Sequence, residues 1–228
     1  MRRTVAGLAG IVAVATAASF ATANAGDPSL SPAQIALFQT EHLKDIAKPV
    51  VLDYAFHHHG GPTGDFDDTV TADIREIHDD GGKDVWIDFL TGEHHMNFPP
   101  ALGFHGNPLL MFFLEHDVVE MRDATGGAAQ FFRNRVRQAF VDRAEMHPVE
   151  ITVDGQKQNA TEIVLAPFRN DPNLMRFPVF AEKIYRFILS DAVPGRLYQI
   201  STSLPATDAA AGAFEESMTY RDEHHEQR

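Results

Sequence analysis

The chain has 228 residues, of which 44% are apolar and 22% are charged, proportions typical of a globular protein rather than a disordered or membrane-embedded one. It carries 19 Lys and Arg against 32 Asp and Glu, a net charge of −13 at pH 7, which excludes nucleic acid and anionic lipid headgroups as main partners because both would be repelled. The absence of cysteine excludes disulfide frameworks, cysteine-ligated metals and cysteine nucleophiles.

The first 25 residues have the features of a secretory signal peptide. Arg2 and Arg3 precede an uncharged, Ala-rich run, and the segment closes on Ala23-Asn24-Ala25, a small-x-small cleavage site before Gly26. The run is short for a bilayer core of about 30 Å, and no later stretch reaches about 18 apolar residues. We therefore expect a mature protein without a transmembrane segment, located in the periplasm or outside the cell, with one domain over residues 26–205.

The mature chain begins with a predicted helix. Ser31 and Pro32 are an N-cap and a proline at the first helical position, and apolar residues then recur near helical spacing, so the pattern predicts a helix over residues 32–46. Pro49 prevents its continuation. A strand over residues 50–56 and a Gly/Pro-rich loop over residues 57–64 are expected next.

A hairpin follows this loop. The run Asp79-Asp80-Gly81-Gly82 is a turn signal between two segments of strand character, residues 66–78 and 83–90. A turn closed at Asp80-Gly81 pairs Ile74 with Ile87 on one face and Arg75 with Trp86 on the other.

The middle of the chain predicts a second helix, of about 17 residues, because Asn107-Pro108 is a start signal and Gly126-Gly127 a stop signal. Its first half, residues 109–114, is apolar on every side, so we expect it to be covered on more than one side, by a packed core or by an apolar ligand. The predicted ligand-binding residues are Leu110, Phe112, Phe113 and Leu114.

The remaining chain alternates strand-like segments with turns. The predicted strands cover residues 130–140, 149–153, 158–168, 184–189 and 197–202. From Ala206 the sequence becomes Ala-rich and then polar, which predicts a disordered tail over residues 206–228. About eight strands with short connections and segregated helices indicate the α+β class, with a curved antiparallel sheet packed on a short N-terminal helix and one apolar middle helix.

This order of elements resembles the periplasmic half-barrel fold of the lipoprotein carriers similar to LolA. The resemblance extends over most of the mature chain and includes the segments Val50-Val51-Leu52-Asp53-Tyr54-Ala55-Phe56 and Lys183-Ile184-Tyr185-Arg186-Phe187. It implies a half-barrel-like sheet that wraps helices lining an apolar cavity, and a carrier for a lipid or lipoprotein.

Twelve histidines are the most unusual feature of the composition. The loops after the first and third predicted strands leave the sheet at the same end, so His57, His58, His59, His94 and His95 are expected on one rim. Imidazoles suit zinc or copper. The alternative is that surface loops hold adjacent histidines without a bound ion.

Other motifs are set aside at this stage. Residues 65–70 match the D-x-D-x-T-V motif of haloacid-dehalogenase-like phosphatases but do not follow a buried strand, which indicates a chance match. His116 and Glu120, one helical turn apart, are interpreted as a solvated helix face. The alternating Arg133, Arg135 and Arg137 predict a positive row on an exposed strand.

Three functions remain open. The first is a non-enzymatic carrier for an apolar ligand, which needs no motif that is missing from the chain. The second is a metal-binding protein or metal-dependent enzyme built on the histidine rim. The third is an accessory protein without a small-molecule ligand.

Overall fold

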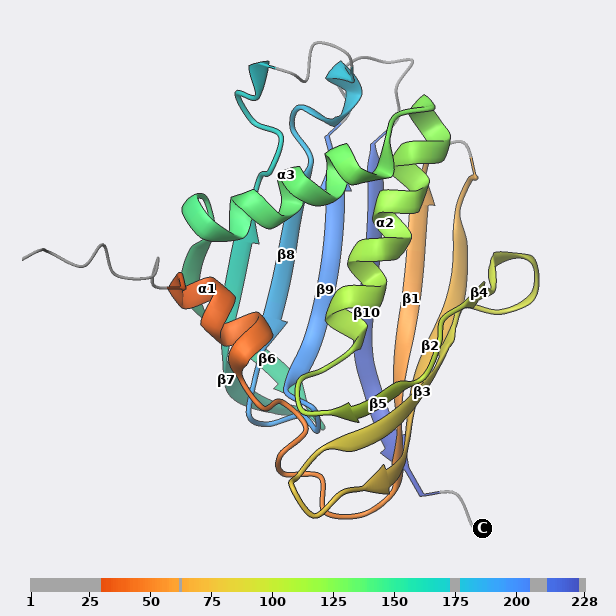
Figure 1. The fold of residues 1–228 in the computed structure, drawn as a ribbon, viewed down its shortest axis with the longest axis vertical. Helices are drawn as coiled ribbons and strands as arrows, with labels where there is room; N and C mark the ends of the chain where they lie inside the picture. Colours follow the sequence, from red (N-terminus) through yellow and green to blue (C-terminus); the bar gives the residue numbers. More distant parts are fainter. Residues whose placement is uncertain (1–29, 62, 173–176, 206–212, 226–228) are drawn as a thin grey trace, which may run out of the picture.

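A single antiparallel sheet forms the body of the protein (Figure 1). The computed structural model describes residues 30–61, 63–172, 177–205 and 213–225, so the predicted signal peptide lies outside the described residues. The strands follow the order β4-β3-β2-β1-β10-β9-β8-β7-β6, with β5 also paired to β3, and the sheet does not close into a barrel. Their bounds are β1 Val50–Gly60, β2 Phe66–Ile77, β3 Lys83–Phe89, β4 Met96–Asn97, β5 Ala101–Phe104, β6 Glu145–Val153, β7 Gln156–Leu165, β8 Ile184–Leu189, β9 Leu197–Leu204 and β10 Phe214–His224.

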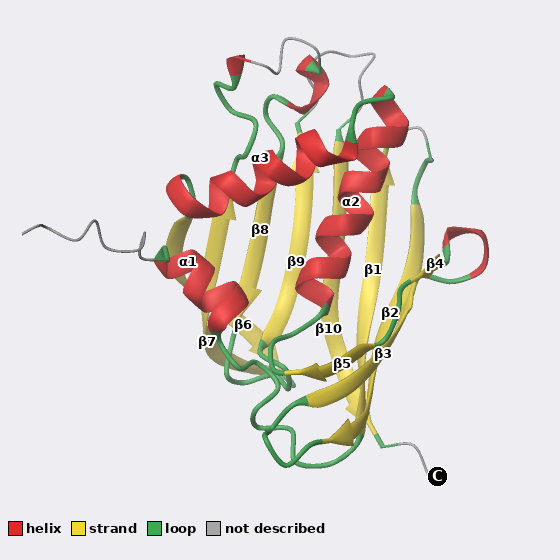
Figure 2. Cartoon of the chain, viewed as in Figure 1, coloured by secondary structure: helices red, strands yellow, loops and turns green. Residues whose placement is uncertain are grey.

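The helices lie on one face of this sheet (Figure 2). They are α1 Pro32–Gln34, which continues into a π-helical turn at Ile35–Gln39, α2 Leu109–Thr125 and α3 Ala129–Asp142. Helix α2 runs along β10 and β1, whereas α3 crosses the strands of the C-terminal half. Short 3₁₀ turns occur at Gly92–His94 and Pro178–Phe180. The α+β class and the curved sheet with helices are confirmed, with ten strands rather than about eight.

The start and end signals of α2 act as predicted. The Asn107 side chain accepts a hydrogen bond from the Leu109 backbone N–H at 3.1 Å. Gly126 adopts a left-handed conformation, with φ of 66°, at the C-terminal end. The helix between these signals has 17 residues. None of the helices in the described ranges is long and apolar enough to cross a membrane.

The N-terminal helix is shorter than predicted. Ser31 and Gln34 form a capping box that starts it, but Thr40 is already extended, with φ of −72° and ψ of 133°. The Ile35 carbonyl accepts both the backbone N–H and the hydroxyl of Thr40, each at 3.0 Å, so the last turn closes at Thr40. Beyond it, Leu43 and Ile46 are still buried in the core, which explains why their apolar spacing resembled that of a helix.

Residues 130–140 belong to helix α3 and not to a strand, so the predicted positive row is wrong. Phe132, Val136, Ala139 and Phe140 are the buried positions, and their spacing of three and four residues is that of a helix. The arginines occupy every second position of this segment, a spacing typical of a strand, although they lie on a helix. Arg133 pairs with Glu115 of α2, Arg135 lies 2.6 Å from Asp171, and Arg137 is exposed.

The first and last strands pair at the centre of the sheet. Strand β1 continues through His57–His59 to Gly60, so the predicted loop over residues 57–64 is half strand. Its partner β10, Phe214–His224, lies within the segment predicted to be a disordered tail, whose residues 206–212 and 226–228 lie outside the described ranges. The outward-facing residues of β10 are polar, so its sequence is less apolar than that expected of a central strand.

The predicted hairpin forms with a register two residues away from the expected one. Ala72 pairs with Ile87 and Ile74 with Val85, because the turn covers residues 78–82 and a bulge follows Ile74. A shift of two keeps each side chain on its predicted face. The Arg75 guanidinium still lies over the Trp86 ring, 4.5 Å from its centroid.

Candidate functional site

Helix α2 presents two different surfaces to the sheet along one face. Leu109, Leu110 and Phe113 in its N-terminal half are fully buried. His116, Asp117 and Glu120 continue the same face at spacings of three and four residues. The buried side of the helix is therefore apolar in its first half and carries ionisable groups, beside Val118 and Met121, in its second half.

The apolar half is the region in which the sequence predicted ligand contacts. Leu110 and Phe113 lie in the core, and the Phe113 ring is 6.4 Å from Phe56 of β1. Phe112 and Leu114 are only partly buried, and Met111 is 43% exposed. This half of the helix is thus covered by the sheet on one side and open to solvent on another.

A short edge segment covers Phe112. Phe98, between β4 and β5, stacks on Phe112 with ring centroids 4.4 Å apart and meets Phe89 of β3 at 5.5 Å. Strand β4 pairs with β3 through two residue pairs, and β5 pairs through two more on either side of an irregularity. Four residue pairs join this segment to β3, against nine between β1 and β2, so less strand pairing opposes its displacement.

The polar half contains a buried cluster centred on Glu216 of β10, whose side chain is 0% exposed. One of its oxygens, Oε1, lies 2.9 Å from Nδ1 of His58 and 3.2 Å from Nε2 of His116. Glu120 Oε1 lies 3.8 Å from the same His116 nitrogen. The other oxygen of Glu216, Oε2, is buried without a hydrogen-bond partner among the described residues.

A second buried ion pair adjoins this cluster. Asp117 accepts hydrogen bonds from the Lys183 ammonium and the Tyr185 hydroxyl, and all three side chains are buried. Lys183 immediately precedes β8, so this pair ties the polar half of α2 to the C-terminal half of the sheet.

Burial and mutual charge shift the pKa values of this cluster in opposite directions. Burial, together with the charge of Glu216, raises the pKa of Glu120 to about 7. Burial alone would raise the pKa of Glu216, but hydrogen bonds from His116 and His58 outweigh it and lower that pKa. Burial would lower the pKa of both histidines, yet the Glu216 carboxylate reverses the effect and raises them. Glu216 is thus the permanent anion of the cluster.

The structure separates the five histidines of the predicted rim. His57 and His59 are exposed and pair with Asp67 at 2.6 Å and Asp65 at 2.9 Å, whereas His58 points inward because side chains alternate along β1. The two loops do meet, since Phe66 stacks on His58 at 4.7 Å and on His94 at 4.0 Å. His95 lies 3.0 Å from the Leu90 carbonyl instead of joining the others.

Sequence reasoning interpreted His116 and Glu120 as a solvated helix face and did not identify Glu216, although signals for their burial existed. His116 follows Phe113 by three residues, which places it on the buried stripe rather than on a solvated face. Glu216 alternates with Met218 on the inward side of β10. The sequence alone does not show which strand or helix packs against these positions. A buried polar residue is recognised only from the groups that it contacts.

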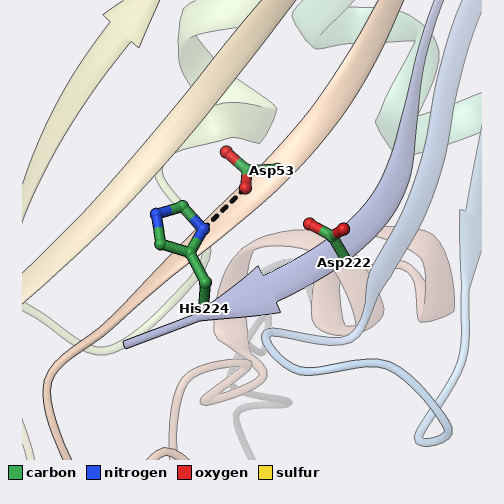
Figure 3. A group of neighbouring side chains, drawn as sticks. All are labelled: Asp53, Asp222 and His224. Atoms are coloured by element: carbon green, nitrogen blue, oxygen red, sulfur yellow. Dashed lines mark hydrogen bonds and ion pairs between the residues drawn. The ribbon is translucent and has the colours of Figure 1, made fainter. Parts of the chain in front are cut away.

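A third group of acidic and histidine side chains lies on the surface (Figure 3). His224 of β10 points to Asp53 of β1, with Nδ1 2.8 Å from the carboxylate, and Asp222 lies beside them. The His224 side chain is 54% exposed, so water competes for every contact and the group resembles an ordinary cross-strand ion pair.

Two open depressions, of about 420 and 760 Å³, lie elsewhere on the molecule. They share His42, Asp191, Ala192 and Arg196, and neither is lined by a residue of α2. Their mixed polar lining does not match an apolar ligand.

Comparisons with known proteins give only distant matches. No protein-family model matches the chain, and no curated protein matches it in sequence. Similar solved structures include lipoprotein LppX from Mycobacterium tuberculosis, with 10% identity, a TM-score of 0.30 and coverage of 75% of this chain and 84% of that chain. A LolA superfamily protein from Nitrosomonas europaea has 10% identity, a TM-score of 0.22 and coverage of 86% and 94%.

A putative outer membrane lipoprotein-sorting protein domain from Vibrio parahaemolyticus has 8% identity, a TM-score of 0.21 and coverage of 84% and 91%. These names agree with the half-barrel resemblance expected from the element order. At such TM-scores the likeness carries no argument about function.

Proposed function

We propose that the protein is a non-enzymatic carrier that binds an apolar ligand, such as a lipid acyl chain, between the N-terminal half of α2 and the sheet. The observation that carries this proposal is the incomplete cover of α2. Phe112 and Leu114 are partly buried, and the segment that stacks on Phe112 is held by few strand pairs. Apolar side chains in such a position gain from contact with an apolar ligand.

The access route follows from the same geometry. Displacing the segment that contains Phe98 exposes the rings of Phe89 and Phe112 without breaking the central strands. The net charge of −13 disfavours an anionic headgroup at the surface, so the acyl chain is the part of the ligand that provides the binding energy.

The proposal includes the compartment. A carrier with this leader acts in the periplasm or outside the cell after residues 1–25 are removed, and the mature chain starts at Gly26. N-terminal sequencing of exported protein checks this start, and retention of Met1 in exported protein contradicts it.

The test of binding is a titration with a fluorescent fatty acid. We expect saturable binding by the parent protein, and Phe112→Ala or Leu114→Ala to change probe affinity more than the unfolding midpoint. Leu110→Ala and Phe113→Ala act mainly on stability, because both side chains lie in the core. Val179→Ala is the control, since Val179 is exposed and apolar but lies outside α2 and the β3–β5 edge.

The access route has its own test, made simple by the absence of cysteine. Asp88 and Asn97 are exposed and directly opposite each other on β3 and β4, so Asp88→Cys with Asn97→Cys allows a cross-strand disulfide. We expect the oxidised form to take up the probe at least about tenfold more slowly than the reduced form, because the edge cannot open.

Equal uptake by both forms contradicts this route. If the parent shows no saturable binding and all four α2 variants are strongly destabilised, the apolar half of α2 is an ordinary core helix and the carrier proposal fails.

A further inference from the structure

Four ionisable side chains from three separate elements meet inside the molecule. His58 lies on β1, His116 and Glu120 on α2, and Glu216 on β10 directly opposite His58. We propose that these four side chains form a binding site for one divalent transition-metal ion of the zinc class. The site adjoins the proposed ligand-binding region, since His116 Nδ1 lies 3.0 Å from Met96 Sδ of β4 and the His116 ring lies 5.3 Å from Phe89, but the metal site does not depend on ligand binding.

The spacing of the donor atoms fits such an ion. One ligand atom each from His58, Glu120 and Glu216 lie within 4.8 Å of one another. His116 Nε2 lies 3.2 Å from the Glu216 carboxylate and 3.8 Å from that of Glu120. Zinc bonds of about 2.0–2.2 Å in a tetrahedron place ligand atoms roughly 3.3 Å apart. Three donor atoms, from His58, Glu120 and Glu216, thus lie within reach of one ion, and His116 Nε2 lies beside both carboxylates as the proposed fourth ligand.

The buried oxygen Oε2 of Glu216 is an independent indication of a ligand. It is shielded from solvent and has no hydrogen-bond partner among the described residues, although a carboxylate oxygen without a partner is costly to bury. A bound cation uses this oxygen directly. If the cluster served only to stabilise the fold, a hydrogen-bond donor would be expected beside Oε2 of Glu216.

The charges balance in the bound state. Two neutral imidazoles, two carboxylates and a divalent cation sum to zero, so the occupied site carries no net charge in the core. The neighbouring Asp117 and Lys183 neutralise each other and do not alter this balance.

The surroundings of the histidines orient them for this role. His58 Nε2 lies 3.2 Å from the Gly60 carbonyl, so a proton on Nε2 donates to that oxygen and leaves Nδ1 free to bind a metal. Phe66 stacks on the His58 ring at 4.7 Å, and Phe214 meets its edge at 5.2 Å. Mixed nitrogen and oxygen donors favour zinc or copper over calcium and magnesium, which prefer oxygen alone.

The test is calorimetric titration of metal-free protein with Zn²⁺, with Ca²⁺ as the comparison. We expect one Zn²⁺ per chain, release of at least about one proton as judged from buffers of different ionisation enthalpy, and no saturable Ca²⁺ binding. Glu216→Gln and His58→Gln should weaken Zn²⁺ binding at least about 100-fold, the upper end of the loss caused by outer-shell partners.

The matched control is His57→Gln with His59→Gln, because these residues flank His58 but are exposed on the opposite face. Loss of binding in this control, with retention in His58→Gln, shows chelation at the surface and overturns the proposal. Absence of saturable Zn²⁺ binding by the parent does the same.

X-ray absorption at the zinc edge of the parent protein needs no variant and so does not depend on variant folding. Scattering from two imidazoles supports the site, and scattering from oxygen ligands alone overturns it.

Discussion

The two halves of helix α2 pack on the same sheet, but burial contributes differently to the free energy of folding in each half. Around Phe113 the inward positions of the sheet are apolar, as at Phe56 of β1 and Met218 of β10. Two residues along each strand, the inward positions become His58 and Glu216. The change from apolar to polar therefore occurs on all three elements at the same level of the structure.

This comparison separates stability from function. Burial of the apolar half removes apolar surface from water and stabilises the fold by about 25 cal/mol per Å². Burial of the polar half requires desolvating charges, and their mutual attraction often returns no more than that cost. Binding of a metal ion, as proposed above, would offset the cost of desolvating these charges.

The largest expected effect comes from breaking the buried pair in the polar half. Lys183→Met leaves the Asp117 carboxylate without its cation, and we expect the free energy of unfolding to fall by about 3–5 kcal/mol. Adding Asp117→Asn removes the unpaired charge and should recover most of the loss. Urea unfolding at pH 7 measures both, and a loss below about 1 kcal/mol in the single variant contradicts the proposed role of the pair.

In the apolar half, the effect of truncation should follow burial. Leu110→Ala should lower the free energy of unfolding by about 3 kcal/mol, because it removes fully buried methyl groups. Met111→Ala, on the adjacent and partly exposed position, should cost less than about 1 kcal/mol. If urea unfolding gives equal losses of unfolding free energy for Leu110→Ala and Met111→Ala, then α2 is covered on both sides.

The smallest effect is a change in pH dependence at Glu120. Its pKa is raised to about 7 in the folded protein, so between about pH 4.5 and 7 the folded state holds more protons than the unfolded state. Stability of the parent therefore falls as pH rises through this range. Glu120→Gln removes that loss and should stabilise the protein by about 1–2 kcal/mol at pH 8, with little change at pH 4.5.

Unfolding of the metal-free protein at the two pH values measures this effect. Asp123→Asn, an exposed acid on the same helix, is the control. Destabilisation of Glu120→Gln at pH 8 would show that the Glu120 carboxylate is ionised and well paired in the folded state.

Local signals in the sequence determined the elements that have clear ends. The cap residues around Asn107 and the glycine at 126 located α2, and a run of mostly apolar and aromatic residues located β8 at residues 184–189. These predictions succeeded because capping and turn chemistry depend on a few neighbouring residues. The α+β class followed from the short connections between strands.

Only the tertiary structure decided the sheet centre and the buried cluster. Strand β10 was predicted as a tail because its outward residues are polar, and α3 as a strand because arginines alternate along it. His58 and Glu216 are 158 residues apart in the sequence and meet only because the first and last strands pair. Long-range pairing is selected by the burial of whole faces, a property that no local pattern contains.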